Sequence, residues 1–103
     1  MKNKSDKEDN EAELKVRLPS KGEQFGIVVG LAGAARFIVS CADGKERLCR
    51  VPGSIKREIW VKEGDYVIVK PWDIDDKRGD IVFRYTHIQV DWLKRKNYLK
   101  DLE

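Results

Sequence analysis

The chain has 103 residues, enough for one domain, and 38% of them are charged, against the roughly 25% that is usual. Its formal net charge of +3 is small, so overall charge does not by itself indicate a polyanionic partner. No apolar run approaches the roughly 20 residues of a membrane-spanning helix, and no hydrophobic signal region begins the chain, which predicts a soluble cytoplasmic protein without a membrane partner.

The N-terminal residues 1–13 contain three lysines and five acidic residues but almost no large apolar side chains. Such a segment buries too little surface to offset its chain entropy, so we predict a disordered tail. A first strand is predicted over residues 23–31, where Phe25, Ile27, Val29 and Leu31 alternate onto one face. Glycines at 26 and 30 interrupt the other face and indicate a bulge or a bend, as in a barrel.

A β-hairpin is predicted where two β-prone runs, residues 37–41 and 45–51, flank Asp43-Gly44. If Asp43-Gly44 is a two-residue turn, Cys41 faces Glu46 across the hairpin. The core face then holds Phe37, Val39, Cys41 and Leu48. The opposite face, where we expect a polyanion to bind, then holds Arg36, Ile38, Ser40, Arg47 and Cys49.

The same register decides the expected state of the two cysteines. Cys49 would face Ile38, so the thiols of Cys41 and Cys49 would lie on opposite faces, and no disulfide is expected. Two thiols and one histidine cannot supply the four ligands of a structural zinc site. We therefore expect reduced cysteines that pack in a cytosolic protein.

The second half of the chain completes an all-β pattern. We expect a short helical segment at 54–61, a strand at 66–70, an acidic loop at 72–80 and a strand at 81–85. Thr86 and Gln89 have capping-box spacing and predict a C-terminal helix over residues 86–103 that packs on the barrel. Five short strands, with the helical turn between the third and fourth, favour a five-stranded Greek-key barrel of the OB-fold type over residues 14–85.

Charge is distributed unevenly along this predicted barrel. Residues 36–62 contain seven cationic and three acidic side chains, whereas residues 63–91 contain four cationic and seven acidic ones. A cationic segment with a nearby aromatic residue predicts a nucleic-acid-binding surface. The candidate RNA-binding residues are Arg36, Lys45, Arg47, Arg50, Lys56, Arg57, Trp60 and Lys62.

The aromatic side chains have less specific patterns. Trp60 fits either stacking on an unpaired base or packing. Trp72, at the mouth of the acidic loop, and Trp92, on the packing face of the helix, are expected to be structural. The three phenylalanines, at positions 25, 37 and 83, lie in alternating apolar strands and are expected in the core.

No catalytic or cofactor site is predicted. His87 is the only histidine, and no nucleophile motif surrounds either cysteine. The acidic loop does not have the spacing of an EF-hand, and no Gly-Lys-Ser/Thr phosphate loop is present. We therefore expect a protein that is not an enzyme and that uses no metal or cofactor.

A set of short motifs, in order and spacing, resembles the archaeal translation initiation factor 1A family, whose relatives include eukaryotic factor 1A and bacterial initiation factor 1. The resemblance covers residues 14–90. The motifs are Arg17-Leu18-Pro19, Gly22-Glu23, Asp43-Gly44-Lys45, Arg47-Leu48-Cys49, Pro52-Gly53, Ile59-Trp60-Val61, Gly64-Asp65, Gly79-Asp80-Ile81-Val82 and Arg84-Tyr85.

The resemblance implies an OB-fold protein that binds ribosomal RNA in the decoding (A) site of the small ribosomal subunit. It also implies support for placing initiator tRNA and mRNA, in concert with other initiation factors. The family's basic positions fall on Arg36, Lys45, Arg47, Lys56 and Arg57, and its tryptophan falls on Trp60. We expect the chain to act as a monomer.

Two other functions remain open from the residues alone. The barrel could be a structural or protein-interaction domain that displays the acidic loop and the C-terminal helix. It could also be a general single-strand RNA binder of the cold-shock kind. That function needs several exposed aromatics on the second and third strands, where the predicted outer face offers Ile38, Ser40 and Cys49 instead.

Overall fold

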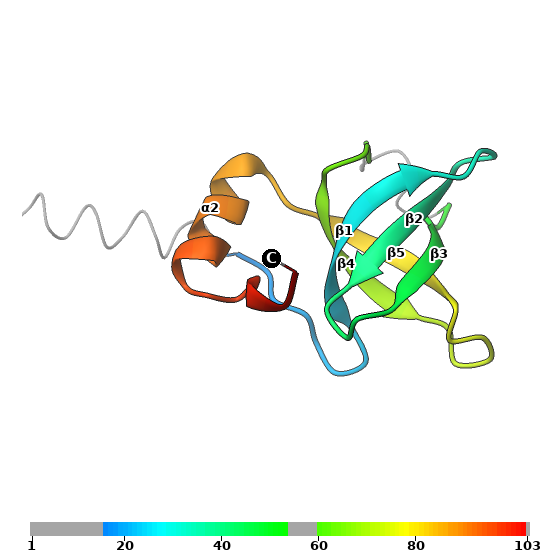
Figure 1. The fold of residues 1–103 in the computed structure, drawn as a ribbon, viewed down its shortest axis with the longest axis horizontal. Coiled ribbons are helices and arrows are strands. Elements are labelled where there is room, and N and C mark those ends of the chain that lie inside the picture. The colour runs from blue at the N-terminus through cyan, green and yellow to red at the C-terminus, as the bar shows by residue number, and fades with distance from the viewer. Residues whose placement is uncertain (1–15, 54–59, 103) are drawn as a thin grey trace, which may run out of the picture.

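The protein is described here by a computed structural model that covers residues 16–53 and 60–102. Five strands form a closed barrel in the order β1-β2-β3-β5-β4, and helix α2 packs beside it (Figure 1). β3 and β5 are parallel, and the other neighbouring strands are antiparallel. The strands are β1 (Gln24–Leu31), β2 (Arg36–Cys41), β3 (Glu46–Arg50), β4 (Tyr66–Pro71) and β5 (Arg78–Arg84).

This barrel confirms the predicted OB-fold architecture. The predicted N-terminal tail and most of the predicted helical segment between β3 and β4 lie outside the described residues. Within the described part of the chain, no helix has the length and apolar character needed to cross a membrane.

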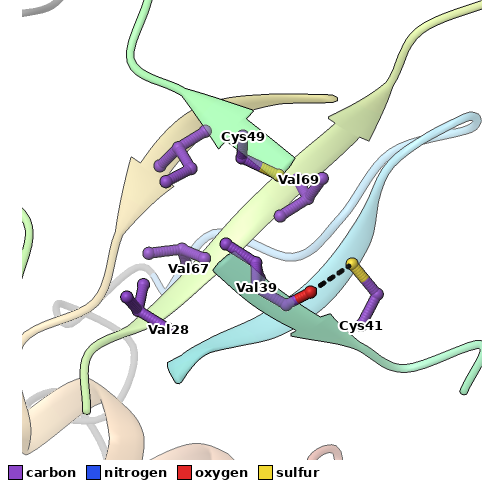
Figure 2. Close-up of a cluster of buried hydrophobic side chains, with 7 residues drawn as sticks. Val28, Val39, Cys41, Cys49, Val67 and Val69 are labelled. Carbon is purple, nitrogen blue, oxygen red and sulfur yellow. Dashed lines mark hydrogen bonds between the residues drawn. The ribbon is translucent and has the colours of Figure 1, made fainter. Parts of the chain in front are cut away.

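The barrel interior is filled by small and medium-sized apolar side chains. Its buried cluster consists of Val28, Val39, Cys41, Cys49, Val67, Val69 and Ile81. Figure 2 shows the valines meeting between the strands, with the Cys41 thiol directed at the carbonyl oxygen of Val39. Both cysteines are free and buried, and burial raises the pKa of Cys49 to about 12, so these thiols are packing groups.

The hairpin register differs by one residue from the predicted one. Val39 pairs with Arg47, and Phe37 pairs with Cys49, because the loop has three residues instead of two. Gly44 takes a left-handed φ of 88°, and its N–H donates to the carbonyl oxygen of Cys41, the geometry of a turn closed by a glycine bulge. A one-residue shift moves every side chain of a strand to the other face.

The shift corrects three predictions about the hairpin. Arg47 is only 3% exposed and faces the interior, so the expectation that it lies on the outer face is wrong. Cys49 joins Cys41 on the buried face, so the reason given for the absence of a disulfide is also wrong, although both thiols are free. Leu48, expected in the core, pairs with Ile38 on the outer side of the hairpin.

The face of β1 that points into the barrel is not the one that carries its large apolar side chains. Gly26 and Val28 are buried, whereas Val29 and Leu31 are 42% and 62% exposed. A Cβ added at Gly26 would lie 2.5 Å from the Val39 side chain, so only glycine allows β1 and β2 to approach this closely. The predicted irregularity is present as a register shift between Val28 and Gly30.

Helix α2 (His87–Arg95) begins with the predicted capping box, in which Thr86 accepts from the Gln89 N–H and Gln89 accepts from the Thr86 N–H. It ends earlier than predicted because Asn97 adopts a φ of 65°, and the Tyr98 N–H donates to the Leu93 carbonyl. This is a Schellman-type end. A short 3₁₀ helix, η1 (Lys100–Leu102), follows.

The helix is joined to the barrel by a second apolar cluster. Its buried members are Ile68, Tyr85, Leu93 and Leu99. Phe25 and Phe83 pack against this cluster, whereas Phe37 packs against the first one, which confirms that the phenylalanines contribute to the core. Trp92 also packs here and stacks on Tyr98, with ring centroids 5.8 Å apart, as expected for a structural residue.

Candidate nucleic-acid interface

Arg47 holds together two loops at one end of the barrel. Its Nη2 donates to Oδ2 of Asp43 in the hairpin loop at 2.8 Å and to Oδ1 of Asp76 in the β4–β5 loop at 3.0 Å. Its Nε donates to the Asp76 carbonyl oxygen at 2.7 Å. The guanidinium is therefore an internal tie between the loops, and in this position it does not reach a ligand on the outer face.

Lys45 belongs to the same network but sits at its surface. Its ammonium group lies 2.8 Å from Oδ2 of Asp76, and its side chain is 62% exposed. An exposed pair of this kind contributes little to stability and can exchange its partner. Lys45 therefore has the exposure required of a candidate RNA contact, although a carboxylate already accompanies it.

The carboxyl of Asp43 provides a pH-dependent test of this network. The Arg47 guanidinium lowers the pKa of Asp43 to about 2, from an ordinary value of 3.8. Because the folded-state pKa is the lower one, stabilisation by ionised Asp43 is complete above about pH 4 and is lost as the pH falls through about 2. Urea denaturation should therefore show the destabilisation by Asp43→Asn to be greatest near neutral pH and to shrink below about pH 4. A difference that stays constant at acid pH would contradict this role.

A row of charged side chains crosses the outside of the barrel. In the strand register, Arg36 of β2 lies opposite Arg50 of β3, and Arg50 lies opposite Asp80 of β5. Asp80 in turn lies opposite Lys70 of β4. The three cationic residues are exposed. We call Arg36, Arg50, Asp80 and Lys70 the charged row; it places two of the predicted RNA-binding residues side by side. Like charges that face each other across strands destabilise a sheet, so the Arg36–Arg50 pair has a cost to the fold.

Arg50 is the most constrained cation of the charged row. Its Nε lies 3.3 Å from Oδ1 of Asp80, and its Cζ lies 5.2 Å from the centre of the Trp72 ring. The Trp72 indole N–H donates to the same Asp80 oxygen at 3.0 Å. Trp72 is thus partly buried against the barrel, as expected, but it also supports an arginine, which sequence reasoning did not anticipate.

The segment that leads into β4 carries the remaining described candidates. Trp60 is 84% exposed, so the packing alternative for this residue is wrong and its ring is accessible. Lys62 is exposed, and the segment is held to β1 by hydrogen bonds between the backbones of Val28, Gly64 and Asp65. Lys56 and Arg57 lie outside the described residues.

A groove between the barrel and α2 extends from Lys62 toward the helix. It has a volume of about 420 Å³, and its lining includes Lys62, Arg84, His87 and Lys94 together with the acidic Asp65 and Asp91. Three of the basic residues that line it, Arg84, His87 and Lys94, were not among the predicted site residues. They are distant in sequence from the hairpin, and only the packing of α2 on the barrel brings them near Lys62.

The described residues contain no group of three or more His, Cys, Asp or Glu side chains arranged to hold a metal ion. Three acids of the predicted acidic loop are instead engaged by cations of the same chain. Asp75 pairs with Arg78, Asp76 with Lys45 and Arg47, and Asp80 with Arg50.

Comparison with known proteins identifies a family and several relatives that this chain resembles. A family model described as "Translation initiation factor 1A / IF-1" matches residues 12–102. Translation initiation factor 1A of Methanopyrus kandleri is 48% identical over 93 residues, 90% of this chain and 84% of the relative. The Archaeoglobus fulgidus factor of the same name is 54% identical over 89 residues, 84% of this chain and 92% of the relative.

A solved structure has the same architecture. The solution structure of translation initiation factor 1 from the Wolbachia endosymbiont strain TRS of Brugia malayi aligns with a TM-score of 0.51 at 34% identity. The alignment covers 63% of this chain and 78% of that one.

Proposed function

This chain belongs to the translation initiation factor 1A / IF-1 family, and from that premise we propose that it binds ribosomal RNA in the decoding (A) site of the small ribosomal subunit. Bound there, it promotes the placement of initiator tRNA and mRNA and acts with the other initiation factors, as a cytoplasmic monomer. The family is non-enzymatic, in agreement with the prediction that this chain is not an enzyme.

The observation that carries the proposal is the position of the exposed cations. Arg36, Arg50 and Lys70 lie in one cross-strand row on the outside of the barrel. Among the described residues, neither Arg36 nor Lys62 has an ion-pair partner. Unpaired cations on a rigid surface are suited to neutralising phosphates, with release of condensed counterions.

The proposed RNA contacts follow from exposure. Arg36, Arg50, Trp60 and Lys62 are kept from the predicted set, and Lys70 joins them because it completes the charged row. Lys45 is kept as a contact that must exchange Asp76 for a phosphate. Lys56 and Arg57 stay in the proposal on the family resemblance alone. Arg47 leaves it, because its guanidinium is buried.

Neither of the two alternative functions has a specific observation in its favour. A protein-interaction role for the acidic loop is weakened because Asp75, Asp76 and Asp80 are already paired within the chain. A general single-strand binder would need aromatics on the outer face of β2 and β3. That face has Ile38, Ser40 and Leu48 between its charged residues, and Phe37 points inward.

Co-sedimentation with purified archaeal small ribosomal subunits tests the proposal. We expect saturable binding at one chain per subunit, which an excess of unrelated RNA does not abolish and which weakens as salt rises. An unrelated OB-fold protein of similar net charge provides the control. Absence of binding by a chain whose circular dichroism shows an intact fold would overturn the proposal.

A further inference from the structure

Asp80 is the one acidic member of the charged row, and it lies between two cations. In the strand register it lies opposite Arg50 of β3 on one side and opposite Lys70 of β4 on the other. Its side chain is 25% exposed, against 59% for Arg50, so the carboxylate lies deeper than the guanidinium that it contacts. A carboxylate in a surface meant for phosphate lowers the local positive potential, so its presence there needs a physical reason.

The hydrogen bonds around Asp80 supply that reason. One oxygen, Oδ1, accepts from the Nε of Arg50 at 3.3 Å and from the indole N–H of Trp72 at 3.0 Å. The Trp72 ring lies along one side of the guanidinium, with the ring centre 5.2 Å from Cζ of Arg50. Arg50 is therefore held at its inner nitrogen and along one side.

The outer part of the guanidinium is left available. Within the described part of the chain, Arg50 makes no side-chain hydrogen bond other than the one from Nε to Asp80. Its two terminal nitrogens form a fork whose geometry suits two parallel bonds to a phosphate. A fork that is already oriented loses less conformational freedom on binding than a free arginine does.

The geometry points to Asp80 and Trp72 as positioning residues that hold Arg50 in its phosphate-binding orientation within the charged row. This inference rests on the proposed function, since the phosphate belongs to the ribosomal RNA that the chain is proposed to bind. Asp80 and Trp72 act through Arg50 and need not touch the RNA. Neither was among the candidate site residues.

Charge alone makes the opposite prediction for Asp80. If the row acted only through its net charge, removing a carboxylate would strengthen binding to RNA, whatever replaced it. If Asp80 positions Arg50, loss of its oxygen atoms weakens binding even though a negative charge is removed. The sign of the effect therefore separates the two mechanisms.

The experiment compares Asp80→Ala with Asp73→Ala, which removes an exposed acid of the neighbouring loop that has no ion pair among the described residues. We expect Asp80→Ala to weaken binding to archaeal small ribosomal subunits by about two- to tenfold, the cost of ordering a flexible side chain on binding. Asp73→Ala should not weaken it. Asp80→Asn, which keeps an acceptor oxygen, should restore most of the affinity.

Three results would overturn the inference. They are binding by Asp80→Ala as tight as that of the wild type, no recovery in Asp80→Asn, or an unchanged effect of Asp80→Ala in an Arg50→Gln background. If Asp80→Ala does not fold, Trp72→Phe takes its place, because it keeps an aromatic ring beside Arg50 and removes the N–H that anchors Asp80, and it too should weaken binding. Failure of the wild type itself to bind subunits would instead refute the proposed function, and this inference with it.

Discussion

Replacing Arg47 with glutamate is expected to unfold the barrel or to bring it close to unfolding. The position is 3% exposed, and the new carboxylate would face those of Asp43 and Asp76. Leaving a buried charge without its counter-charge costs about 3–5 kcal/mol, which is a large part of the roughly 5–15 kcal/mol that stabilises a domain. Thermal and urea denaturation followed by circular dichroism would measure the loss.

Arg47→Met is the matched control for this prediction. Methionine has a similar length and suits an apolar interior, and the carboxylates that it leaves behind, on Asp43 and Asp76, are 35% and 56% exposed and can be hydrated by water. We therefore expect a much smaller loss of stability than for Arg47→Glu, with subunit binding retained. Strong loss of binding by a stably folded Arg47→Met would show that the guanidinium contacts RNA after all.

The second large effect is expected from combining Arg36→Glu with Lys62→Glu, which reverses two surface cations that have no ion-pair partner within residues 16–53 and 60–102. If each cation contacts a phosphate, the double variant should bind small subunits on the order of 100-fold more weakly, because each charged hydrogen bond contributes about 1.5 kcal/mol or more. The dependence of log affinity on log salt should also become shallower by about two. Equilibrium binding at several salt concentrations would measure both quantities.

The stability of this double variant should remain close to that of the wild type. Arg36→Glu places opposite charges across β2 and β3, where Arg36 and Arg50 now face each other, so it removes a repulsion. A double variant with the same change in net charge, Lys21→Glu with Lys100→Glu, controls for long-range electrostatics, since both lysines are exposed and lie outside the charged row. Equal loss of affinity in the two double variants would refute a specific role for Arg36 and Lys62.

The parts of the fold that depend on local sequence were predicted from it. Four of the five strands lie within one residue of their predicted bounds, and the capping box of α2 follows from the spacing of Thr86 and Gln89. β5 begins at Arg78, three residues before its predicted start, because residues 78–80, assigned to the acidic loop, pair with β3. The end of α2 was missed because asparagine, unlike glycine, does not usually indicate a left-handed helix end. Here Asn97 takes that role.

The errors at the candidate site have one main physical cause. Asp43-Gly44 suits a two-residue turn as well as a three-residue loop that ends in a left-handed glycine, and the two loops differ by one residue in register. The prediction took the two-residue turn, which places Leu48 in the core and Arg47 on the outer face. The native three-residue loop turns Arg47 inward, where it bonds to Asp76. These two residues are 29 positions apart in the chain and meet only in the closed barrel, so no local pattern reveals their contact.

The charged row escaped prediction for a similar reason. Arg50 and Asp80 become neighbours through the parallel pairing of β3 with β5, which no local pattern in the chain reveals. Composition could place an excess of cations in residues 36–62, but Lys70 lies in the segment with an excess of acids. Lys70 belongs to the charged row only because β4 lies next to β5 in the barrel.

The buried Arg47 also has a consequence for how the barrel reaches a single structure. A hairpin slipped by one residue would turn Leu48 inward and both Arg47 and Cys49 outward, so it is the alternative strand alignment that the fold must disfavour. In that state the guanidinium is outside and cannot bridge Asp43 and Asp76. The bonds of Arg47 to Asp43 and Asp76 therefore stabilise the native alignment of β2 and β3 and not the slipped one, so the β4–β5 loop, which contains Asp76, helps to specify the register of a hairpin to which it does not belong.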